Sequence, residues 1–268
     1  MSVRLVDAAG TLHAPINSHA TPRIVSLVPS VTELLCDLGL ARWLVGRTGF
    51  CIHPEHAVAA IPKVGGTKDV NIEKIRRLAP THLLVNIDEN EKPTVDLLRQ
   101  TIPHVIVTHP QTPRDNLSLY RLLGGIFGAD AEALRLCGEF ERAYAELATR
   151  PKGEPKTVLY CIWKDPWMTV ARNTYIAAML DLIGWHQWHS GLPQAEHGAA
   201  RYPRFDWDQA LLASIDEILL SSEPYRFNEG HVAELANQTG KPVRLVDGEM
   251  FSWYGSRAIR GLHYLQDL

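Results

Sequence analysis

Short aliphatic runs alternate with helical patterns along the first part of the chain. Arg23–Val28 (RIVSLV) is rich in β-branched residues, which indicates a buried strand. Pro29 follows, and Ser30 with Glu33 fits the capping-box pattern that begins a helix. The alternation continues with predicted strands at Trp43–Thr48, His82–Asn86 and Val105–Thr108, and with a helix over Asn71–Leu78 capped by Asn71. Strands that alternate with helices predict a largely parallel α/β lobe.

The pattern becomes helical with little interruption from about Pro113 to Leu147. Its later part, Ala129–Leu147, keeps apolar residues at helical spacing and would extend roughly 28 Å at 1.5 Å per residue. After a polar break at Arg150–Pro155 the alternation resumes. Strands are expected at Thr157–Trp163, Met168–Ala171, Glu217–Ser221 and Val243–Val246, and helices from about Thr174, Asp206, Asn228 and Ser256. We therefore predict an N-terminal extension (1–22), an α/β lobe (23–112), a connecting helical segment (113–150) and a second α/β lobe (151–268).

An internal match supports two related lobes. Asn71–Asn86 and Asp206–Ser221 align without a gap, and in each a capping Asn or Asp opens a helix that is followed by an aliphatic strand. An acidic residue stands two places after each cap, Glu73 in one and Asp208 in the other. A match over so short a stretch is weak by itself. Together with the long central helix, it favours two related lobes over one continuous sheet.

Composition and charge exclude several classes of protein. The chain is 46% hydrophobic and 21% charged with a net charge of −3, which is ordinary for a globular protein and leaves no electrostatic footprint for nucleic acid. It has no apolar stretch long enough to span a bilayer. Residues 1–22 lack the basic and apolar regions of a secretory signal, so we expect a cytoplasmic protein, or a periplasmic one if a leader was removed.

Several segments occur in the order of a known family: RIVSLVPSVTELLCDLG, then IPKVGG followed by NIEKIRRLAPTHLLV, and finally DGEMFSWYGSR. The chain resembles the helical-backbone (class III) solute-binding proteins from about Arg23 to Leu268, and GFCIHPEH is closest to a cobalamin-binding subgroup. The resemblance implies two Rossmann-like α/β lobes with mainly parallel sheets, joined by one long rigid α-helix, with the ligand cleft between the lobes.

The implied function is non-catalytic binding of a metal chelate, as a transport substrate-binding protein or an intracellular carrier. Cobalamin is the first choice, haem or a ferric siderophore comes next, and no catalytic cofactor is implied. The resemblance also implies that a carboxylate on each lobe docks onto an ABC permease, and by position these are Glu73 and Asp208, with Asp where Glu is usual. The alternative is that both merely interact with a helix dipole, worth about 0.3–1 kcal/mol. We expect a monomer that does not span a membrane.

Ligands of open α/β lobes bind outside the carboxyl ends of the strands, and here the loops at those ends are rich in aromatic residues. Aromatic rings cover a flat macrocycle well, and a few polar groups fix its rim. Arg257 would pair with a propionamide or carboxylate edge. For any single ring, core packing is the alternative. The predicted ligand-binding residues are Phe50, Cys51, His53, Trp163, Trp167, Tyr225, Phe227, Phe251, Trp253, Tyr254 and Arg257.

The loop Phe50–His56 is the best metal candidate, with Cys51, His53 and His56 within six residues. Imidazole and thiolate suit zinc, cobalt or iron, but a fourth ligand is missing. We therefore favour the alternative in which a histidine caps a turn and Cys51 packs inward, while His53 remains able to supply an axial nitrogen to a bound chelate. A second group, His186, His189 and His197, lies in a loop that we expect to be a mobile rim of the cleft.

A competing hypothesis is a cytoplasmic metal chelatase-like enzyme that acts on a tetrapyrrole. It needs a general base, for which His53 and His109 are the candidates. The sequence contains no nucleophile elbow, P-loop, GxGxxG after a strand or HExxH motif. We therefore favour a binding protein over an enzyme.

Overall fold

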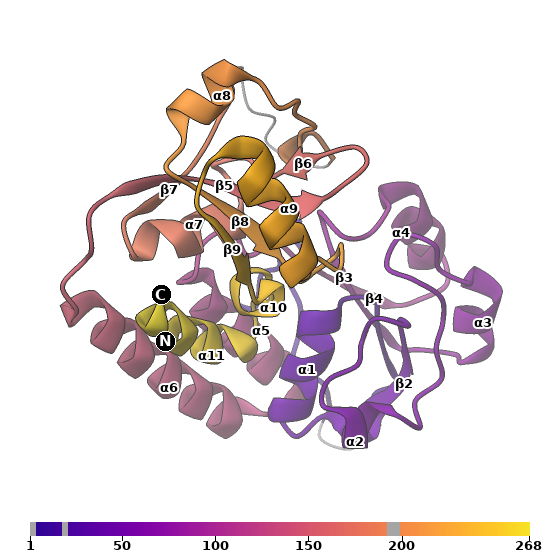
Figure 1. The fold of residues 1–268 in the computed structure, drawn as a ribbon. Coiled ribbons are helices and arrows are strands. Elements are labelled where there is room, and N and C mark those ends of the chain that lie inside the picture. The colour runs from indigo at the N-terminus through magenta and orange to yellow at the C-terminus, as the bar shows by residue number, and fades with distance from the viewer. Residues whose placement is uncertain (1–3, 18–20, 192–198) are drawn as a thin grey trace. The chain divides into compact units, whose positions relative to one another are not determined.

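The computed structural model describes residues 4–17, 21–191 and 199–268. The chain forms two compact units that are not contiguous in sequence (Figure 1). The first contains the chain up to Pro110, Arg114–Glu141 and Tyr254–Arg257. The second contains Gln111–Pro113, Arg142–Trp253 and Ala258–Leu268. The predicted lobes were continuous, so the return of Tyr254–Arg257 to the first unit is a feature that sequence patterns did not reveal.

The first unit is built on a parallel sheet, as predicted. Its strands are β1 (Ile24–Ser26), β2 (Leu44–Arg47), β3 (His82–Asn86) and β4 (His104–Thr108), in the order β2-β1-β3-β4. The registers pair Ile24 with His82 and His82 with His104. All five residues of β3 are buried, which explains why these strands are continuous aliphatic runs rather than alternating ones.

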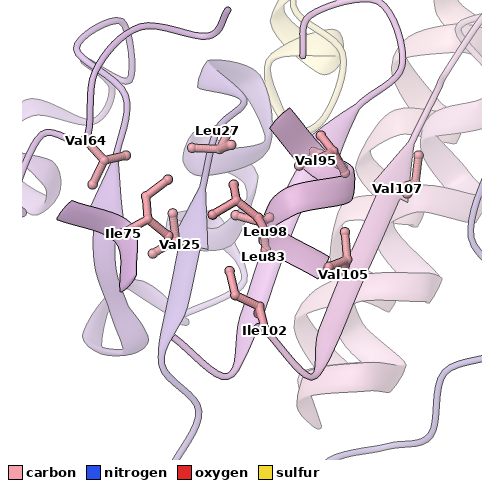
Figure 2. Packing of buried hydrophobic residues seen from close by; sticks show 11 residues of the cluster. Val25, Leu27, Val64, Ile75, Leu83, Val95, Leu98, Ile102, Val105 and Val107 are labelled. Carbon is pink, nitrogen blue, oxygen red and sulfur yellow. The ribbon is translucent and has the colours of Figure 1, made fainter. Parts of the chain in front are cut away.

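Helices cover the sheet of the first unit. They are α1 (Pro29–Asp37), α2 (Glu55–Val58), α3 (Ile72–Arg77) and α4 (Lys92–Arg99), with a 3-10 turn at Ala41–Trp43. Ile75 of α3 and Leu98 of α4 pack with Val25 and Leu83 in one hydrophobic core, as Figure 2 shows. The predicted cap of α3 is confirmed, because Asn71 Oδ1 accepts a hydrogen bond from the Lys74 amide at 2.8 Å.

The capping box predicted at Ser30 and Glu33 is wrong. Helix α1 begins at Pro29, its N-cap is Val28, and no side chain caps it. Proline at the first helical position has no amide hydrogen to satisfy, so the helix can begin one residue before the predicted cap. Ser30 therefore lies inside the helix, and the carboxylate of Glu33 is used elsewhere.

The predicted helical segment consists of two helices. Helix α5 (Asp115–Phe127) ends at Gly128, whose φ of +66° is the left-handed conformation that glycine adopts readily, and α6 (Asp130–Thr149) follows. Helix α6 matches the expected range Ala129–Leu147 closely. The division between the two units falls within α6, between Glu141 and Arg142.

The second unit repeats the strand order of the first. Strands β5 (Lys156–Trp163), β7 (Trp185–Gln187), β8 (Glu217–Ser221) and β9 (Val243–Val246) are parallel, with β7 and β8 on opposite sides of β5, and β6 (Met168–Thr169) is antiparallel to β5. The helices are α7 (Tyr175–Leu182), α8 (Gln209–Ser214), α9 (Glu229–Thr239), α10 (Gly248–Ser252) and α11 (Arg257–Tyr264), with 3-10 turns at Ala199–Arg201 and Leu265–Asp267. The order β7-β5-β8-β9 corresponds to β2-β1-β3-β4, so two lobes of the same topology are present.

The internal match is correct for the strands and shifted for the caps. The strands of the matched segments, β3 and β8, begin at the aligned positions His82 and Glu217. Helix α8, however, begins at Gln209 and is capped by Asp208, not by Asp206. In the structure, Asp208 caps its helix as Asn71 does in the first unit. Asp208 corresponds to Glu73 only in the sequence alignment of the two segments.

Candidate functional site

The strand order of each unit marks where a ligand is expected. In a sheet ordered 2-1-3-4, the connections leave the first and third strands in opposite directions, and ligands bind at the carboxyl ends of those two strands. In the first unit these ends are Ser26 of β1 and Asn86 of β3. In the second unit they are Trp163 of β5 and Ser221 of β8.

In the first unit, two asparagines shape the loop after β3. Asn90 accepts a hydrogen bond from the Asn86 amide at 2.8 Å and donates through Nδ2 to the Thr67 carbonyl at 2.8 Å and the Leu27 carbonyl at 3.3 Å. Asn86 Oδ1 in turn accepts from the Asp88 amide at 2.8 Å. The loop is thus tied to the ends of neighbouring strands and presents two carboxylates, Asp88 and Glu89.

Both carboxylates have side-chain partners within the first unit. Asp88 Oδ2 lies 3.2 Å from His109 Nε2, and both side chains are largely buried. Glu89 Oε1 accepts a hydrogen bond from the Tyr254 hydroxyl at 2.7 Å. Burial, reinforced by the charge of Glu89, raises the pKa of Tyr254 well above its usual value, so the hydroxyl stays protonated and donates. Tyr254, predicted to bind ligand, is therefore placed as a partner of Glu89.

The loop Phe50–His56 places its residues on opposite sides. The side chains of Phe50 and Ile52 are exposed, 62% and 50%, whereas Cys51 is fully buried between them. Cys51 Sγ accepts a hydrogen bond from the Thr32 hydroxyl at 3.1 Å and lies 3.1 Å from the Thr48 hydroxyl. Burial raises the pKa of the thiol, which opposes formation of the thiolate that metals prefer. This agrees with the interpretation in which Cys51 packs inward.

The histidines of the same loop do not form a metal site with Cys51. His53 is partly buried just before α2, and His56 is exposed within α2. No group of three or more His, Cys, Asp or Glu side chains suited to a metal ion occurs in residues 4–17, 21–191 and 199–268. His197 and part of the predicted mobile rim lie outside the described residues. His186 belongs to β7, and its Nδ1 lies 2.9 Å from Asp181 Oδ1.

In the second unit, the predicted aromatic residues lie together after β5 and β8. Trp163, 39% exposed, contacts Tyr225 edge to face at 5.5 Å between ring centroids. Trp167 stacks on Phe227 at 5.8 Å, and Tyr225 lies 4.6 Å from Phe227. The amide of Tyr225 donates to the Ile162 carbonyl, which joins the two loops. The four rings that were predicted as ligand contacts thus lie together, and Trp163 is the most exposed of them.

The remaining predicted aromatic residues of this unit have structural contacts. Phe251 is fully buried and contacts Tyr160 at 5.5 Å and Tyr264 at 5.9 Å between ring centroids. Trp253 is 7% exposed, and its Nε1 donates to Glu223 Oε1 at 2.9 Å. Sequence reasoning selected the loop that contains Glu223 but not Glu223 itself. Its position directly after β8 was the only available signal.

Arg257, also predicted to bind ligand, is buried in the first unit. Its Nε and Nη2 donate to the two carboxylate oxygens of Glu33 at 2.7 and 2.8 Å, and both residues are 4% exposed. Tyr120 and Asn116 hold the preceding Gly255 through its carbonyl and amide, at 2.8 and 2.6 Å. The Nε and Nη2 of Arg257 are thus engaged in the interior of the first unit.

The two carboxylates expected to dock onto a permease have different surroundings. Glu73 is exposed on α3 and pairs with Arg76 at 2.8 Å. Asp208 is exposed too, but its Oδ1 accepts from the Leu211 amide at 2.7 Å as the cap of α8. It also lines a hollow of about 620 Å³ with Arg204 and Thr157. Thr157 is near the start of β5, so this hollow is distinct from the carboxyl-end loops.

These features define a two-lobed α/β binding fold of the class III type, with parallel sheets in both lobes. A model of the periplasmic binding protein family (Peripla_BP_2) matches residues 24–240. The chain belongs to the periplasmic binding protein family. Among the described residues, no helix combines the length and apolar character needed to cross a membrane.

Two curated relatives were found. An uncharacterized ABC transporter substrate-binding lipoprotein, YvrC of Bacillus subtilis (strain 168), is 28% identical over 60% of this chain. The match spans only about half of that relative, 53% of its length. A vitamin B12-binding protein of Pectobacterium carotovorum subsp. carotovorum (strain PC1) is 22% identical over 90% of this chain and 86% of its own.

Solved structures show the same fold. The periplasmic vitamin B12 binding protein BtuF of Vibrio cholerae superposes with a TM-score of 0.73 at 20% identity, covering 92% of this chain and 97% of its own. The periplasmic haem-binding protein BhuT in complex with two haems gives a TM-score of 0.75 at 20% identity, covering 92% and 99%. All four of these similar proteins carry names of binding proteins. The chelatase-like alternative has no support from the comparisons.

Proposed function

We propose that this protein binds a metal-chelate macrocycle, with cobalamin as the first choice, and serves as the substrate-binding component of an ABC transporter. The observation that carries the proposal is the group of four rings, Trp163, Trp167, Tyr225 and Phe227, at the carboxyl ends of β5 and β8. A flat macrocycle presents a large apolar face, and aromatic rings cover such a face with few rotatable bonds to immobilise. Membership in a family of binding proteins supports the same conclusion.

A titration with three chelates tests the proposal. Cyanocobalamin, haemin and ferrichrome differ in ring, charge and metal, and each changes its visible spectrum or quenches tryptophan fluorescence on binding. We expect submicromolar affinity for cyanocobalamin without chemical conversion, and a rise in Tm that depends on ligand concentration. Absence of binding to all three chelates, or insertion of metal into a free porphyrin, would contradict the proposal.

A pair of variants tests the role of the rings. Trp163→Ala removes the most exposed ring and should weaken binding by about tenfold, or about 1.4 kcal/mol. Trp43→Ala is the control, because Trp43 immediately precedes β2 and lies at the amino end of a strand. Equal loss of affinity in the two variants would show that the effect is not specific to the carboxyl ends.

His53 is the residue proposed to supply an axial nitrogen to the bound metal. His53→Ala should shift the visible spectrum of the bound chelate, because the axial ligand sets the electronic environment of the metal. His56→Ala, three residues along in α2, is the matched control. A spectrum that is unchanged in both variants would remove His53 from the ligand set and leave the ring surface intact.

The transport role requires contact with a permease, for which Glu73 is the stronger candidate. Its pair with Arg76 is solvent-exposed, and such pairs contribute only about 0–1 kcal/mol, so Glu73 can exchange Arg76 for another cation. Asp208 would have to engage a permease through Oδ2 while Oδ1 caps α8. Glu73→Gln should lower stimulation of permease ATPase activity in proteoliposomes, whereas Glu229→Gln, on the exposed start of α9, should not.

The proposed location is outside the cytoplasmic membrane. Relatives of this chain are described as periplasmic or as a lipoprotein, which supports the periplasmic alternative and not the cytoplasmic carrier. Fractionation of cells that express the gene from its own start, followed by immunodetection, tests this. Recovery in the cytosolic fraction alone would contradict a transport role.

A further inference from the structure

The loop that follows β8 contains a carboxylate beside the aromatic surface. Glu223 is two residues before Tyr225, whose ring contacts Trp163. Two residues of chain span at most about 7 Å between Cα atoms, so the backbone of Glu223 lies close to that of Tyr225. A macrocycle on Trp163 and Tyr225 that extends along this loop would bring part of its edge toward Glu223.

The side chain of Glu223 is held in place on one side only. Oε1 accepts hydrogen bonds from the Ser252 hydroxyl at 2.6 Å and from Trp253 Nε1 at 2.9 Å. Oε2 accepts none from the part of the chain that the structure describes. Gly248 packs against the side chain so closely that a Cβ there would lie 2.7 Å from Glu223 Cγ. The carboxylate is thus preorganised, with one oxygen left as an acceptor.

The charges near Glu223 have the same sign as its own. Burial raises the pKa of Glu223, and the carboxylates of Glu249 and Asp247 raise it further, while the hydrogen bonds from Ser252 and Trp253 oppose the rise. A ligand group that donates a hydrogen bond would relieve this crowding of negative charge. A ligand carboxylate would add to it.

We propose that Glu223 is a specificity-determining residue that favours ligands whose edge donates hydrogen bonds, such as carboxamides, over ligands whose edge carries carboxylates. This inference rests on the proposed function, because it assumes a chelate on the Trp163–Tyr225 surface. Corrin rings carry carboxamides and haem carries propionates, so Glu223 selects cobalamin-type over haem-type ligands. Negative selection of this kind acts by penalising the wrong ligand and adds little affinity for the right one.

Three probes and three variants test the inference. The probes are cyanocobalamin, haemin and the dimethyl ester of haemin, which has the same ring and metal without the two negative charges. Glu223→Gln keeps an oxygen acceptor for Trp253 and removes the charge, Glu223→Asp keeps the charge, and Glu229→Gln changes an exposed carboxylate of α9 as the control. Dissociation constants are measured at neutral pH for each pair.

For Glu223→Gln we expect haemin to bind about tenfold more tightly, equivalent to about 1.4 kcal/mol, and cyanocobalamin to change by less than about threefold. Glu223→Asp and Glu229→Gln should keep the preference of the wild type. The wild-type protein should also bind the dimethyl ester about tenfold more tightly than haemin, which needs no variant and so remains informative if Glu223→Gln does not fold.

The failure of this inference is distinguishable from the failure of the proposed function. If the wild-type protein binds none of the three probes, the proposed function and the inference are both wrong. If it binds cyanocobalamin, but haemin and its ester bind equally and Glu223→Gln leaves their affinities unchanged, the proposed function stands and Glu223 has no role in selection.

Discussion

The buried pair of Glu33 and Arg257 allows a quantitative prediction. Both side chains are at most 5% exposed, and the two hydrogen bonds of 2.7 and 2.8 Å use both carboxylate oxygens. Removal of one partner of such a pair leaves an uncompensated charge in the interior and typically costs about 3–5 kcal/mol. Since a folded domain is stable by only about 5–15 kcal/mol, Arg257→Met should lose a large fraction of the total.

Urea denaturation at 25 °C measures the effect, with fluorescence and circular dichroism followed together to test for a single transition. The double variant Glu33→Gln, Arg257→Met removes both charges and should recover part of the loss, because no ion is then left buried alone. The coupling energy from the complete cycle should exceed about 1.5 kcal/mol in favour of the pair.

The prediction also separates two roles for Arg257. If Arg257→Met lowers the free energy of unfolding by less than about 1 kcal/mol but weakens ligand binding, the reasoning from the buried pair is refuted. Arg257 would then act on the ligand edge, as its place in the strand-end loop predicted. If stability falls as predicted and ligand affinity per folded molecule is unchanged, Arg257 acts only through Glu33.

Three further predictions concern residues away from the ligand. Burial, and then the neighbouring His104 and His13, lower the pKa of His82 from 6.5 to about 4. The neutral side chain therefore stabilises the fold fully above about pH 6.5, and this contribution is lost as pH falls toward 4. After allowance for solvent screening the contribution is worth about 1–2 kcal/mol, and His82→Gln should flatten the acid limb of a stability–pH curve. If the acid limb is equally steep in wild type and variant, other groups cause it. Gly65 has a φ of +109°, and a Cβ there would lie 2.3 Å from the Asp69 carbonyl oxygen. Gly65→Ala should therefore lower the free energy of unfolding by about 2 kcal/mol or more, measured by thermal unfolding. A variant whose stability lies within about 0.5 kcal/mol of wild type, the scale of a neutral surface change, would contradict this. Because its thiol is buried and protonated, Cys51 should react with a maleimide only after unfolding, and rapid labelling of the native protein would contradict its placement.

Local patterns were sufficient to predict most of the secondary structure. Strands β3, β8 and β9 begin and end at the predicted residues, because each is a short aliphatic run flanked by turn-forming or polar residues. The cap of α3 was also correct, and α9 begins directly after Asn228 as expected, since Asn at these positions accepts backbone hydrogen bonds. The short elements β7 and α10 were missed, because they contain too few residues to show a period.

Long-range pairing explains what the sequence did not reveal at the candidate site. The position of Arg257 in a loop at the carboxyl end of a strand suggested a ligand contact, but its partner Glu33 lies 224 residues away and no local pattern connects the two. Similarly, Glu223 becomes notable only when Ser252 and Trp253 are placed beside it by the fold. The aromatic rings near Trp163 were predictable, because their loops directly follow strands whose carboxyl ends are expected to face ligand.

The return of Tyr254–Arg257 to the first unit has a consequence for the order of events during synthesis. The first unit receives its last segment near the end of translation, although α1 and β1 leave the ribosome among the first elements. Until Arg257 emerges, Glu33 lacks its bidentate partner, so the nascent first unit remains incomplete for most of translation. A fragment that ends before Tyr254 is accordingly expected to remain partly unfolded, however intact its sheet.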